Sequence, residues 1–550
     1  MYTGHVVDTL LMSRLQSPHR QTPKGYKGRG PHSVEAWGVR FGSLKIEHED
    51  WTQYSEDMLE RCKQDVEIQQ KIYYALRKEG EGKNLGAAHK LNVKLFHYLQ
   101  LQEEYGWTFD REHVKKNLAT LDRWMKKIEK VLAPHLPMLV IPLETKTKEG
   151  YAYVKKPFKK NGEYSKYACE YLGEYIRDCC GPFSRFTIRP ISLDSTVEVK
   201  QFLLDQGWKP AKWNEKDGKR TSANLSKDDP FDGVQSALGK LVAKRIQCRQ
   251  RRSVLEGWQK NCREDGKLSP RVGGIATTGR LRHAGIVNVP SPHSGAFFAV
   301  PMRQCFTARK GWKMVGVDSK GNQMRQLAAR MGDEEFTHAV LFGTQEDKTD
   351  LHSLNQRRSG AATRSLAKNF FYGSILFGAG DAKTAKLLDT TKEKARKLKE
   401  DYLNGMPKLK AVIEGLKKEW HITAKRMYNP RFNRVEYFGG YIRGIDGRGI
   451  LVPFEKDLLC YALQSDEAIQ MGAAYVILHK RAEKKGWKLN EDWQMLIWMH
   501  DEFQMESRPE IVEELGQLGC KAIKWAGEFF NINCPHDGEY LIGDNWNETH

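Results

Sequence analysis

Three side chains suited to binding a nucleotide follow one another at intervals of four residues. Arg364, Lys368 and Tyr372 belong to the stretch RSLAKNFFYGSILFGAG. On a helix, residues four apart lie on one face, so this face would carry a guanidinium, an ammonium and a phenol ring. Arginine forks onto phosphate oxygens, and lysine acts as a compact point charge. The spacing predicts a helix that receives a triphosphate with a base attached, although spaced cations on a helix more often form only a solvated face.

Acidic residues flank this helix in the sequence on both sides. The run WKMVGVD predicts a buried strand that ends at Asp318, and the run QMLIWMHDEFQM predicts a hairpin whose turn carries His500, Asp501 and Glu502. Asp318 and Asp501 are 183 positions apart (501 minus 318), so only the fold can bring them together. Mg²⁺ binds to a few carboxylates together with substrate phosphates. The two aspartates are therefore candidate metal ligands.

Together these segments resemble the motifs of the family A (Pol I-like) DNA polymerases. R-x3-K-x3-Y-G resembles motif B, VGVDSKGNQMR with Asp318 resembles motif A, and IWMHDEFQ resembles motif C. TTGRLRHAGIVNVP with Arg280, DLHSLNQ with His352 and ALQSDEA with Gln464 follow the family's order. Any one motif is weak, but six in order are specific. The resemblance runs over about residues 7–550 and is greatest to the replicative polymerases of short-tailed phages.

The resemblance implies an α/β fold, of the α+β kind, arranged as the palm, fingers and thumb of a right hand. An incomplete RNase H-like 3′–5′ exonuclease domain would precede the hand. The implied segments are residues 1–85 for the partial exonuclease domain, 86–265 for the thumb with a basic insertion near 143–168, 266–330 for the first part of the palm, 331–440 for the fingers and 441–550 for the second part of the palm.

The resemblance also implies a catalytic centre with two Mg²⁺ ions, for which Mn²⁺ can substitute. Asp318 and Asp501 would hold both ions, with the backbone carbonyl of Ser319 as a further ligand. Glu502 would be an accessory catalytic carboxylate. Two ions about 4 Å apart stabilise the attacking and leaving oxygens of such a displacement.

A second group of residues would bind the incoming dNTP. Lys368 would bind the triphosphate and protonate the leaving pyrophosphate, Arg364 would hold the γ-phosphate, and Tyr372 would stack on the base and sugar. His352 would contact a phosphate, although a lone histidine is more often structural. Gln323 stands where the family usually has a glutamate that closes off the ribose 2′ position. It keeps the bulk and loses the charge, so exclusion of ribose should persist.

Other residues would contact primer–template DNA. Arg280 and Gln464 match family residues that probe the minor groove at the primer end, and His500 would touch the primer terminal phosphate. The densest cationic segment, KRIQCRQRR, predicts a helix that lines the duplex exit, with a plain solvated surface as the alternative. Its arginines are Arg245, Arg249 and Arg252.

The nucleotide helix departs from the family pattern near its end. After the lysine, the family usually reads Y-G-x-x-Y-G, whereas here Tyr372-Gly373 is followed by Phe377-Gly378, one residue late. Leu376 then takes the place of the second tyrosine, unless the helix bulges. The sequence leaves the positioning of the template base open.

The N-terminal segment carries part of an exonuclease pattern. VVDTLLMSRL predicts a strand leading into a helix, and Ser55 to Lys78 predict one long helix that carries Asp65. Asp65 matches the last aspartate of the family's nuclease, but Arg61 replaces the usual tyrosine, and the first two nuclease motifs do not occur. We expect no proofreading by this chain alone. A separate polypeptide that completes the domain and a simple truncation are equal alternatives, and the question of a processivity factor stays open.

Composition limits the partners and the compartment. A formal net charge of +20 over 550 residues favours a polyanionic partner, because contacts to phosphates release counterions. Ten cysteines without C-x-x-C spacing predict reduced thiols in a cytoplasm, that of a bacterial host if the protein belongs to a phage. No apolar run approaches the roughly 18 residues that span a membrane, so we expect no membrane partner.

Three function classes fit these patterns to different degrees, and DNA-templated DNA synthesis is the main interpretation. Single-subunit RNA polymerases share the Arg/Lys/Tyr helix, but their motif C typically reads HDS and their motif A lacks a bulky gate. A non-catalytic DNA-binding remnant is disfavoured by the intact Asp318, Asp501, Lys368 and Arg364. A P-loop in GAGDAKT fails, because no glycine directly precedes the lysine.

Overall fold

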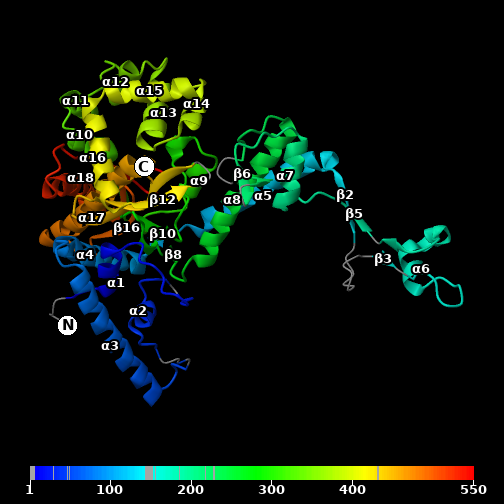
Figure 1. The fold of residues 1–550 in the computed structure, drawn as a ribbon. Coiled ribbons are helices and arrows are strands. Elements are labelled where there is room, and N and C mark those ends of the chain that lie inside the picture. Colours follow the sequence, from blue (N-terminus) through cyan, green and yellow to red (C-terminus); the bar gives the residue numbers. More distant parts are fainter. Residues whose placement is uncertain are drawn as a thin grey trace. The chain divides into compact units, whose positions relative to one another are not determined.

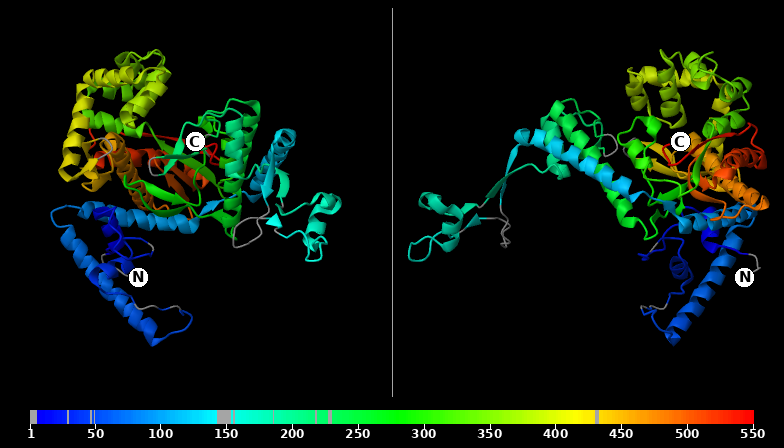
Figure 2. Two further views of the ribbon diagram at one scale, coloured as in Figure 1. Left: turned by 45° about the vertical axis from the view of Figure 1, so that its right-hand side comes forward. Right: turned by 180° about the vertical axis from the view of Figure 1, so that it is seen from behind.

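The computed structural model describes residues 6–28, 30–45, 48, 50–142, 153–154, 156–184, 186–216, 219–226, 230–429 and 433–550. The chain forms two compact units. The first joins Met1–Asp110 to Asn261–His550, and the second is Arg111–Lys260. Figures 1 and 2 show the helices and strands of each unit.

A four-stranded antiparallel sheet lies at the centre of the first unit. Its strands follow the order β16 (Trp493–Met499), β17 (Glu502–Ser507), β11 (Lys313–Ser319) and β18 (Gly538–Gly543). Apolar residues buried on both faces make β11 and β16 nearly continuous hydrophobic runs. The structure confirms the strand predicted to lead into Asp318 and the hairpin predicted around Asp501.

Long helices bury this sheet. They are α4 (Gly86–Tyr105), α17 (Leu458–Lys484) and α18 (Val512–Phe529). Their shared core includes Val317, Tyr475, Trp498 and Phe503, and burying one such side chain stabilises the fold by about 1.5–3 kcal/mol. Helix α18 approaches the sheet closely at Gly519, where a Cβ would come within 2.8 Å of Val317. These helices fix the strands that carry the acidic residues.

A mainly helical part of the first unit lies between β11 and α17 in sequence. It comprises α10 (Asn322–Met331), α11 (Glu334–Leu341), α12 (Leu351–Ser359), α13 (Arg364–Phe370), a π-helical segment (Phe371–Leu376), α14 (Asp381–Leu387), α15 (Lys392–Asn404) and α16 (Pro407–Thr423). Their core holds the fully buried rings of Phe336, Phe370, Phe371, Tyr402 and Trp420. The helical prediction for residues 331–440 is confirmed except at its end, where β12 (Lys425–Asn429) and β13 (Arg434–Phe438) form a hairpin.

Short elements complete the first unit beside the sheet. Strand β1 (Trp107–Thr108) pairs with β8 (Lys267–Leu268), β9 (Arg271–Ile275) with β10 (Leu281–Ala284), and β14 (Gly440–Arg443) with β15 (Gly449–Val452). Helix α9 spans Ala299–Arg303, and short 3₁₀ turns span Pro292–Ser294, Glu455–Asp457 and Pro509–Ile511. The β9–β10 hairpin carries Arg280 in its connecting turn.

The N-terminal segment is helical in its described residues. It contains α1 (Thr9–Gln16), α2 (Val34–Phe41) and α3 (Glu56–Glu79). Figure 2 shows α3 as one long continuous helix. The strand predicted before α1 is wrong for the described residues 6–8, because the Asp8 side chain accepts a hydrogen bond from the Leu11 amide and starts the helix. The long helix predicted from Ser55 is confirmed, with Ser55 as its N-cap.

The second unit has a helical core and several small hairpins. Its helices are α5 (Arg111–Leu132), α6 (Lys166–Leu172), α7 (Thr196–Asp205) and α8 (Ala237–Asn261), with 3₁₀ turns at Ala133–His135 and Gly173–Asp178. Its strands pair as β2 (Met138–Pro142) with β5 (Phe186–Pro190), β3 (Tyr153–Val154) with β4 (Phe183–Ser184), and β6 (Trp213–Lys216) with β7 (Lys219–Ala223). Within the basic insertion near 143–168, residues 143–152 and 155 lie outside the described residues.

Across the part of the chain that the structure describes, no helix combines the length and the apolar character needed to cross a membrane.

Candidate active site

Two aspartates from distant parts of the chain meet at one end of the central sheet. Strand β11 pairs with β17 so that Asp318 lies opposite Glu502. The Ser319 amide donates a hydrogen bond to the Asp501 carbonyl oxygen at 3.0 Å. His500 turns the chain between β16 and β17 with φ +60°, in the left-handed region. The sheet thus brings together two residues, Asp318 and Asp501, that are 183 positions apart in the sequence (501 minus 318).

The environment of the two carboxylates disfavours their negative charge. Burial raises the pKa of Asp318 to about 8, and the nearby carboxylates of Asp501 and Glu502 add to the shift. Burial also raises the pKa of Asp501, against the opposing effect of its own backbone amide. Among the described residues, neither carboxylate forms an ion pair. A bound divalent ion would neutralise the charge of such crowded carboxylates, which have no ion pair among the described residues.

The donor set fits Mg²⁺ that shares its coordination with a substrate. Within the described residues, no group of three or more His, Cys, Asp or Glu side chains could hold a metal ion by itself. Mg²⁺ is usually held by one or two carboxylates, water and substrate phosphates. Glu539, which the sequence reasoning missed, lies opposite Asp318 on β18 and raises its pKa further. Only the pairing of β18 with β11 reveals this residue.

Glu502 faces a different environment from Asp501. Its carboxylate accepts hydrogen bonds from Trp546 Nε1 and Gln504 Nε2, each at 2.7 Å, and lies 3.0 Å from His550 Nδ1. Burial tends to raise the pKa of Glu502, but the hydrogen bond and charge of His550 outweigh it and lower the pKa. The oxygens of Glu502 therefore already have protein partners at the start of β17, and its expected role as an accessory catalytic carboxylate stays a prediction.

The cationic residues predicted to bind a nucleotide gather on α12 and α13. Arg364 pairs with Asp350, Nη2 to Oδ2, at 2.7 Å. Asp350 is also the N-cap of α12, where it accepts hydrogen bonds from the His352 amide and the Ser353 hydroxyl. Although burial opposes the change, these bonds lower the pKa of Asp350 to about 2. The guanidinium of Arg364 is therefore held in place by a charged anchor.

The other members of this group lie beside Arg364. The rings of His352 and Tyr372 are 5.7 Å apart, edge to face. Burial lowers the pKa of His352, and the charges of Arg364 and Lys368 lower it further. Lys368 is exposed and has no ion pair within the described residues. The structure thus brings Arg364, Lys368, Tyr372 and His352 together, although it leaves their roles as proposals.

A π-helical turn resolves the shifted pattern at the end of this helix. Residues Phe371–Leu376 form a π-helix, whose wider turn takes up one extra residue. Leu376 is fully buried, whereas Phe377 is 48% exposed. Gly378 follows with φ +60°, and a Cβ there would lie 2.0 Å from the Lys456 carbonyl oxygen, so only glycine fits. The helix does bulge, and the accessible side chain after the bulge is that of Phe377 rather than that of Leu376.

Glu467 connects two of the predicted substrate residues. It is buried on α17 and accepts a hydrogen bond from Gln323 Nε2 at 2.8 Å. Arg280 donates to its other oxygen, Nη2 to Oε1, at 2.5 Å. Burial raises the pKa of Glu467, and the charge of Arg280 opposes the shift. The sequence reasoning passed over Glu467, although two adjacent acidic residues inside the mainly apolar helix α17 were a visible signal.

The remaining predicted DNA contacts of the first unit lie nearby in the fold. Gln464 lies on α17, one turn before Glu467, and its amide donates to the Cys460 sulfur at 3.1 Å. His500 faces His283 edge to face, with ring centres 6.3 Å apart. Burial lowers the pKa of His500, and the charge of Arg280 lowers it further. Both effects favour the neutral form of the His500 ring, against the charges of Asp501 and Glu502.

The three arginines predicted to line a DNA duplex have carboxylate partners in the second unit. Arg245 is only 6% exposed and pairs with Glu129 and Asp194. Arg249 shares Asp194, and Arg252 pairs with Asp122 and Glu256. We correct the expectation for Arg245, whose buried guanidinium holds α8 to neighbouring segments. The helix prediction for KRIQCRQRR is confirmed as part of α8.

Asp65, which the resemblance matched to the last aspartate of the family's nuclease, lies on α3. Its carboxylate pairs with Lys45 Nζ at 2.5 Å, and the Asp65 side chain is 38% exposed. Arg61, one turn earlier on α3, stands where the family has a tyrosine. These contacts give Asp65 a structural partner within the N-terminal segment.

Comparison with known proteins assigns the family. The family model described as DNA polymerase family A matches residues 173–548. The chain belongs to DNA polymerase family A, and its activity is DNA-templated DNA synthesis. It is 27% identical over 646 residues to the DNA-directed DNA polymerase of Enterobacteria phage T3, covering 99% of this chain and 88% of that protein. The DNA-directed DNA polymerase of Escherichia phage T7 is 26% identical over 640 residues, with the same coverage.

A solved structure supports the same fold. The POL domain of Pol1 from M. smegmatis, in complex with DNA primer-template and dNTP, superposes with a TM-score of 0.69 at 15% identity. The superposition covers 98% of this chain and 82% of that one. The superposition confirms the predicted mixed helix-and-strand fold, while the family model and the phage relatives confirm the predicted family and polymerase activity.

Proposed function

We propose that this chain is a replicative DNA polymerase of a phage, and that it extends a primer 3′-hydroxyl with dNTPs at the Asp318–Asp501 site. The observation that carries the proposal is the meeting of these two carboxylates at the end of β11, with no ion pair to either among the described residues. Asp318, Asp501 and the carbonyl of Ser319 would hold Mg²⁺. When bound, two such ions activate the primer hydroxyl and neutralise the charge of the displaced pyrophosphate.

The residues around this centre divide the remaining work. Lys368, exposed on α13, would bind the triphosphate and give a proton to the leaving pyrophosphate. Arg364, fixed by Asp350, would present its remaining donors to the terminal phosphate. His352 would keep Tyr372 in position below the base through their edge-to-face contact. Phe377 would meet the template base, because it is the exposed ring after the π-turn.

Three parts of the chain would form the hand. The sheet with α17 and α18 would be the palm, α10 to α16 the fingers, and the second unit, Arg111–Lys260, the thumb. Arg280, Gln464 and His500 would contact the primer end. The proposed thumb starts later in the chain than the sequence predicted, because residues 86–110 belong to the first unit.

Primer extension with Mg²⁺ and dNTPs tests this proposal. Asp318→Asn and Asp501→Asn should each slow extension about a thousandfold, since each removes several kcal/mol of charge stabilisation. Duplex binding should persist, because backbone contacts dominate affinity. Asp537→Asn is the matched control, as Asp537 is a nearby carboxylate that pairs with Lys320. Near-normal extension by Asp501→Asn would refute the assignment, and extension with rNTPs alone would favour an RNA polymerase.

A further inference from the structure

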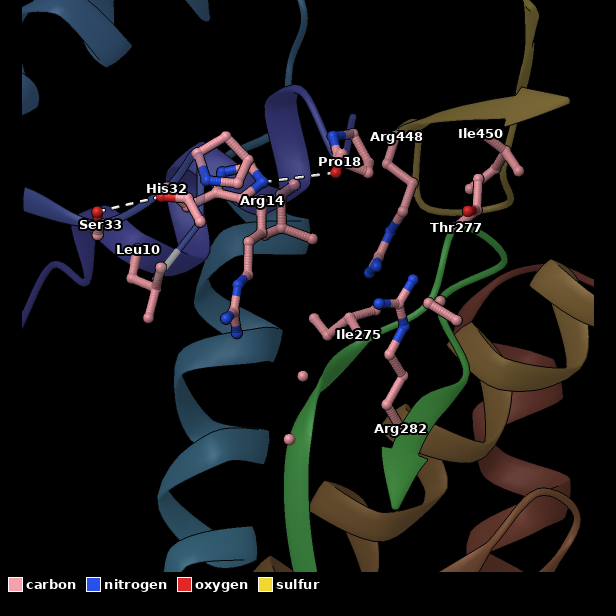
Figure 3. A pocket seen from close by; sticks show the side chains of 17 residues that line it. Leu10, Arg14, Pro18, His32, Ser33, Ile275, Thr277, Arg282, Arg448 and Ile450 are labelled. Atoms are coloured by element: carbon pink, nitrogen blue, oxygen red, sulfur yellow. Dashed lines mark hydrogen bonds between the residues drawn. The ribbon is translucent and has the colours of Figure 1, made fainter. Parts of the chain in front are cut away.

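A cationic cavity of about 460 Å³ lies between the N-terminal segment and the β9–β10 hairpin, inside the first unit. Figure 3 shows Arg14, Arg282 and Arg448 reaching into the same space from α1, from β10 and from the loop between β14 and β15. None of the described residues that line it is acidic. Three arginines from distant parts of the chain therefore share a cavity whose described lining has no carboxylate.

Two of these arginines have unused donors. Among the described residues, Arg14 and Arg282 form no ion pair and no side-chain hydrogen bond. Arg14 lies over the backbone of Gly274, where a Cβ would come 3.6 Å from Nη1 and where φ is +147°. Burial lowers the pKa of Arg14, and although Asp8 opposes the shift, the charge of Arg282 adds to it. Like charges in a partly buried space repel, and an anion bound between them would relieve the repulsion.

The third arginine and the histidines have fixed partners. Arg448 is buried and donates from Nε and Nη2 to Asp446 Oδ2, at 2.8 and 2.5 Å. His32 contacts Ser13 Oγ at 2.9 Å and the Pro18 carbonyl at 3.4 Å, and burial lowers its pKa to about 4. His19 contacts the Thr277 hydroxyl at 2.9 Å, and burial lowers its pKa also. Among the described residues that line the cavity, the arginines therefore carry its positive charge.

We propose that this cavity is a second phosphate-binding site, separate from the polymerase centre, and that it takes the phosphodiester backbone of a single DNA strand. Guanidinium groups fork onto phosphate oxygens, and two of them converge here. A strand is favoured over a free nucleotide because Arg282 is two residues from Arg280, which binds Glu467 beside the polymerase centre. This step rests on the proposed function, in which Arg280 contacts the primer end: two residues span at most about 7 Å, so a strand leaving that end reaches the cavity within a few nucleotides.

Binding of a fluorescein-labelled oligothymidylate of about 12 nucleotides to the full chain, over a range of salt concentrations, tests this site. Arg14→Gln and Arg282→Gln should each weaken binding and flatten the slope of log K against log salt by about 0.7. The matched control is Arg271→Gln, an exposed arginine on the same hairpin that does not line the cavity. Affinities and slopes equal to those of the unmodified chain in both variants would overturn the proposal.

Further measurements separate the source of the phosphate from effects on folding. Arg14→Lys keeps the charge and should retain most of the binding lost in Arg14→Gln. A 4-thiothymidine oligonucleotide should cross-link within residues 10–18 or 273–282, and cross-links found only elsewhere would contradict the site. If dTMP or inorganic phosphate displaces the strand from the unmodified chain, and if both Gln variants lose this displacement, the cavity binds free phosphates. That outcome would overturn the assignment to a strand. Primer extension by both variants should stay normal, which separates this result from any failure of the polymerase assignment.

Discussion

The side-chain amide of Gln323 donates a hydrogen bond to Oε2 of Glu467 at 2.8 Å. The family usually carries a glutamate where this chain has Gln323. A carboxylate is nevertheless present at this site. It is supplied by α17 and is tied to Arg280 through its other oxygen. One buried carboxylate thus positions both the residue expected at the sugar and the residue expected at the primer end.

Glu467→Gln should weaken the selection of dNTPs over rNTPs. The substitution keeps the volume but loses the charged acceptor, and a hydrogen bond to a charged group is worth about 1.5–3 kcal/mol. We expect the ratio of kcat/KM for dNTP to that for rNTP to fall about tenfold, with a rise in KM for the primer–template. Asp537→Asn, which removes a nearby carboxylate that pairs with Lys320, is the control. An unchanged ratio would show that Gln323 excludes ribose without Glu467.

Tyr372 should make the enzyme sensitive to dideoxynucleotides. Its hydroxyl has no hydrogen-bond partner among the described residues, while burial raises the pKa of the phenol. The phenol of Tyr372 can replace the contact that the 3′-hydroxyl, missing from a dideoxynucleotide, would have made. Chain termination should be efficient in the unmodified chain, and Tyr372→Phe should restore discrimination. Termination assays at matched dNTP and ddNTP concentrations measure this, and equal incorporation by both proteins counts against it.

His479 should make stability fall in mild acid. Its ring stacks on Tyr98 at 4.1 Å, and burial lowers its pKa to about 3. Because the unfolded chain binds this proton near pH 6.5, stability is complete above that pH and is lost as pH falls toward 3, by about 1.4 kcal/mol at pH 5.5. His479→Phe should flatten the change in Tm between pH 7.5 and 5.5. His135→Phe, at an exposed position, should leave it intact, and an unaltered slope in His479→Phe would refute the assignment.

The chain alone should show no proofreading. Asp65 pairs with Lys45, whereas a two-metal nuclease needs several carboxylates that converge on one point. We propose that any proofreading partner brings those carboxylates on a separate polypeptide. Purified protein with Mg²⁺ should leave a mismatched 3′ end intact. The Asp501→Asn variant separates degradation from reversal of synthesis, and degradation that disappears in Asp65→Asn would contradict this prediction.

The sequence predicted local elements of the site well. Apolar runs before Asp318 and around Asp501 predicted β11 and the β16–β17 hairpin, because buried strands are read from composition alone. The four-residue spacing likewise placed Arg364 and Lys368 on one helix, α13. These signals lie within a dozen residues and do not depend on what packs against them.

What the sequence did not predict depends on partners distant along the chain. Arg245 looked available for DNA, but Glu129 lies 116 positions away, and only the fold pairs them. The contacts of Glu502 with Trp546 and His550 were likewise not predictable from the residues around Asp501. Asp501 lies in the turn and Glu502 is the first residue of β17, so adjacent carboxylates can have different environments. Pairings of this kind have no local signature.

The wide turn at Phe371–Leu376 also shows how a protein can lengthen without a loop. Added residues usually collect in surface connections, where the backbone is free to rearrange. Here the π-helical turn accommodates the one-residue offset from the family pattern Y-G-x-x-Y-G, and the offset is confined to that turn. Arg364 and Lys368 keep their spacing ahead of it, and Phe377 regains an exposed position beyond it. An alignment that forbids gaps inside helices would place Leu376 opposite the family tyrosine. It would thereby assign a role at the surface to a buried side chain.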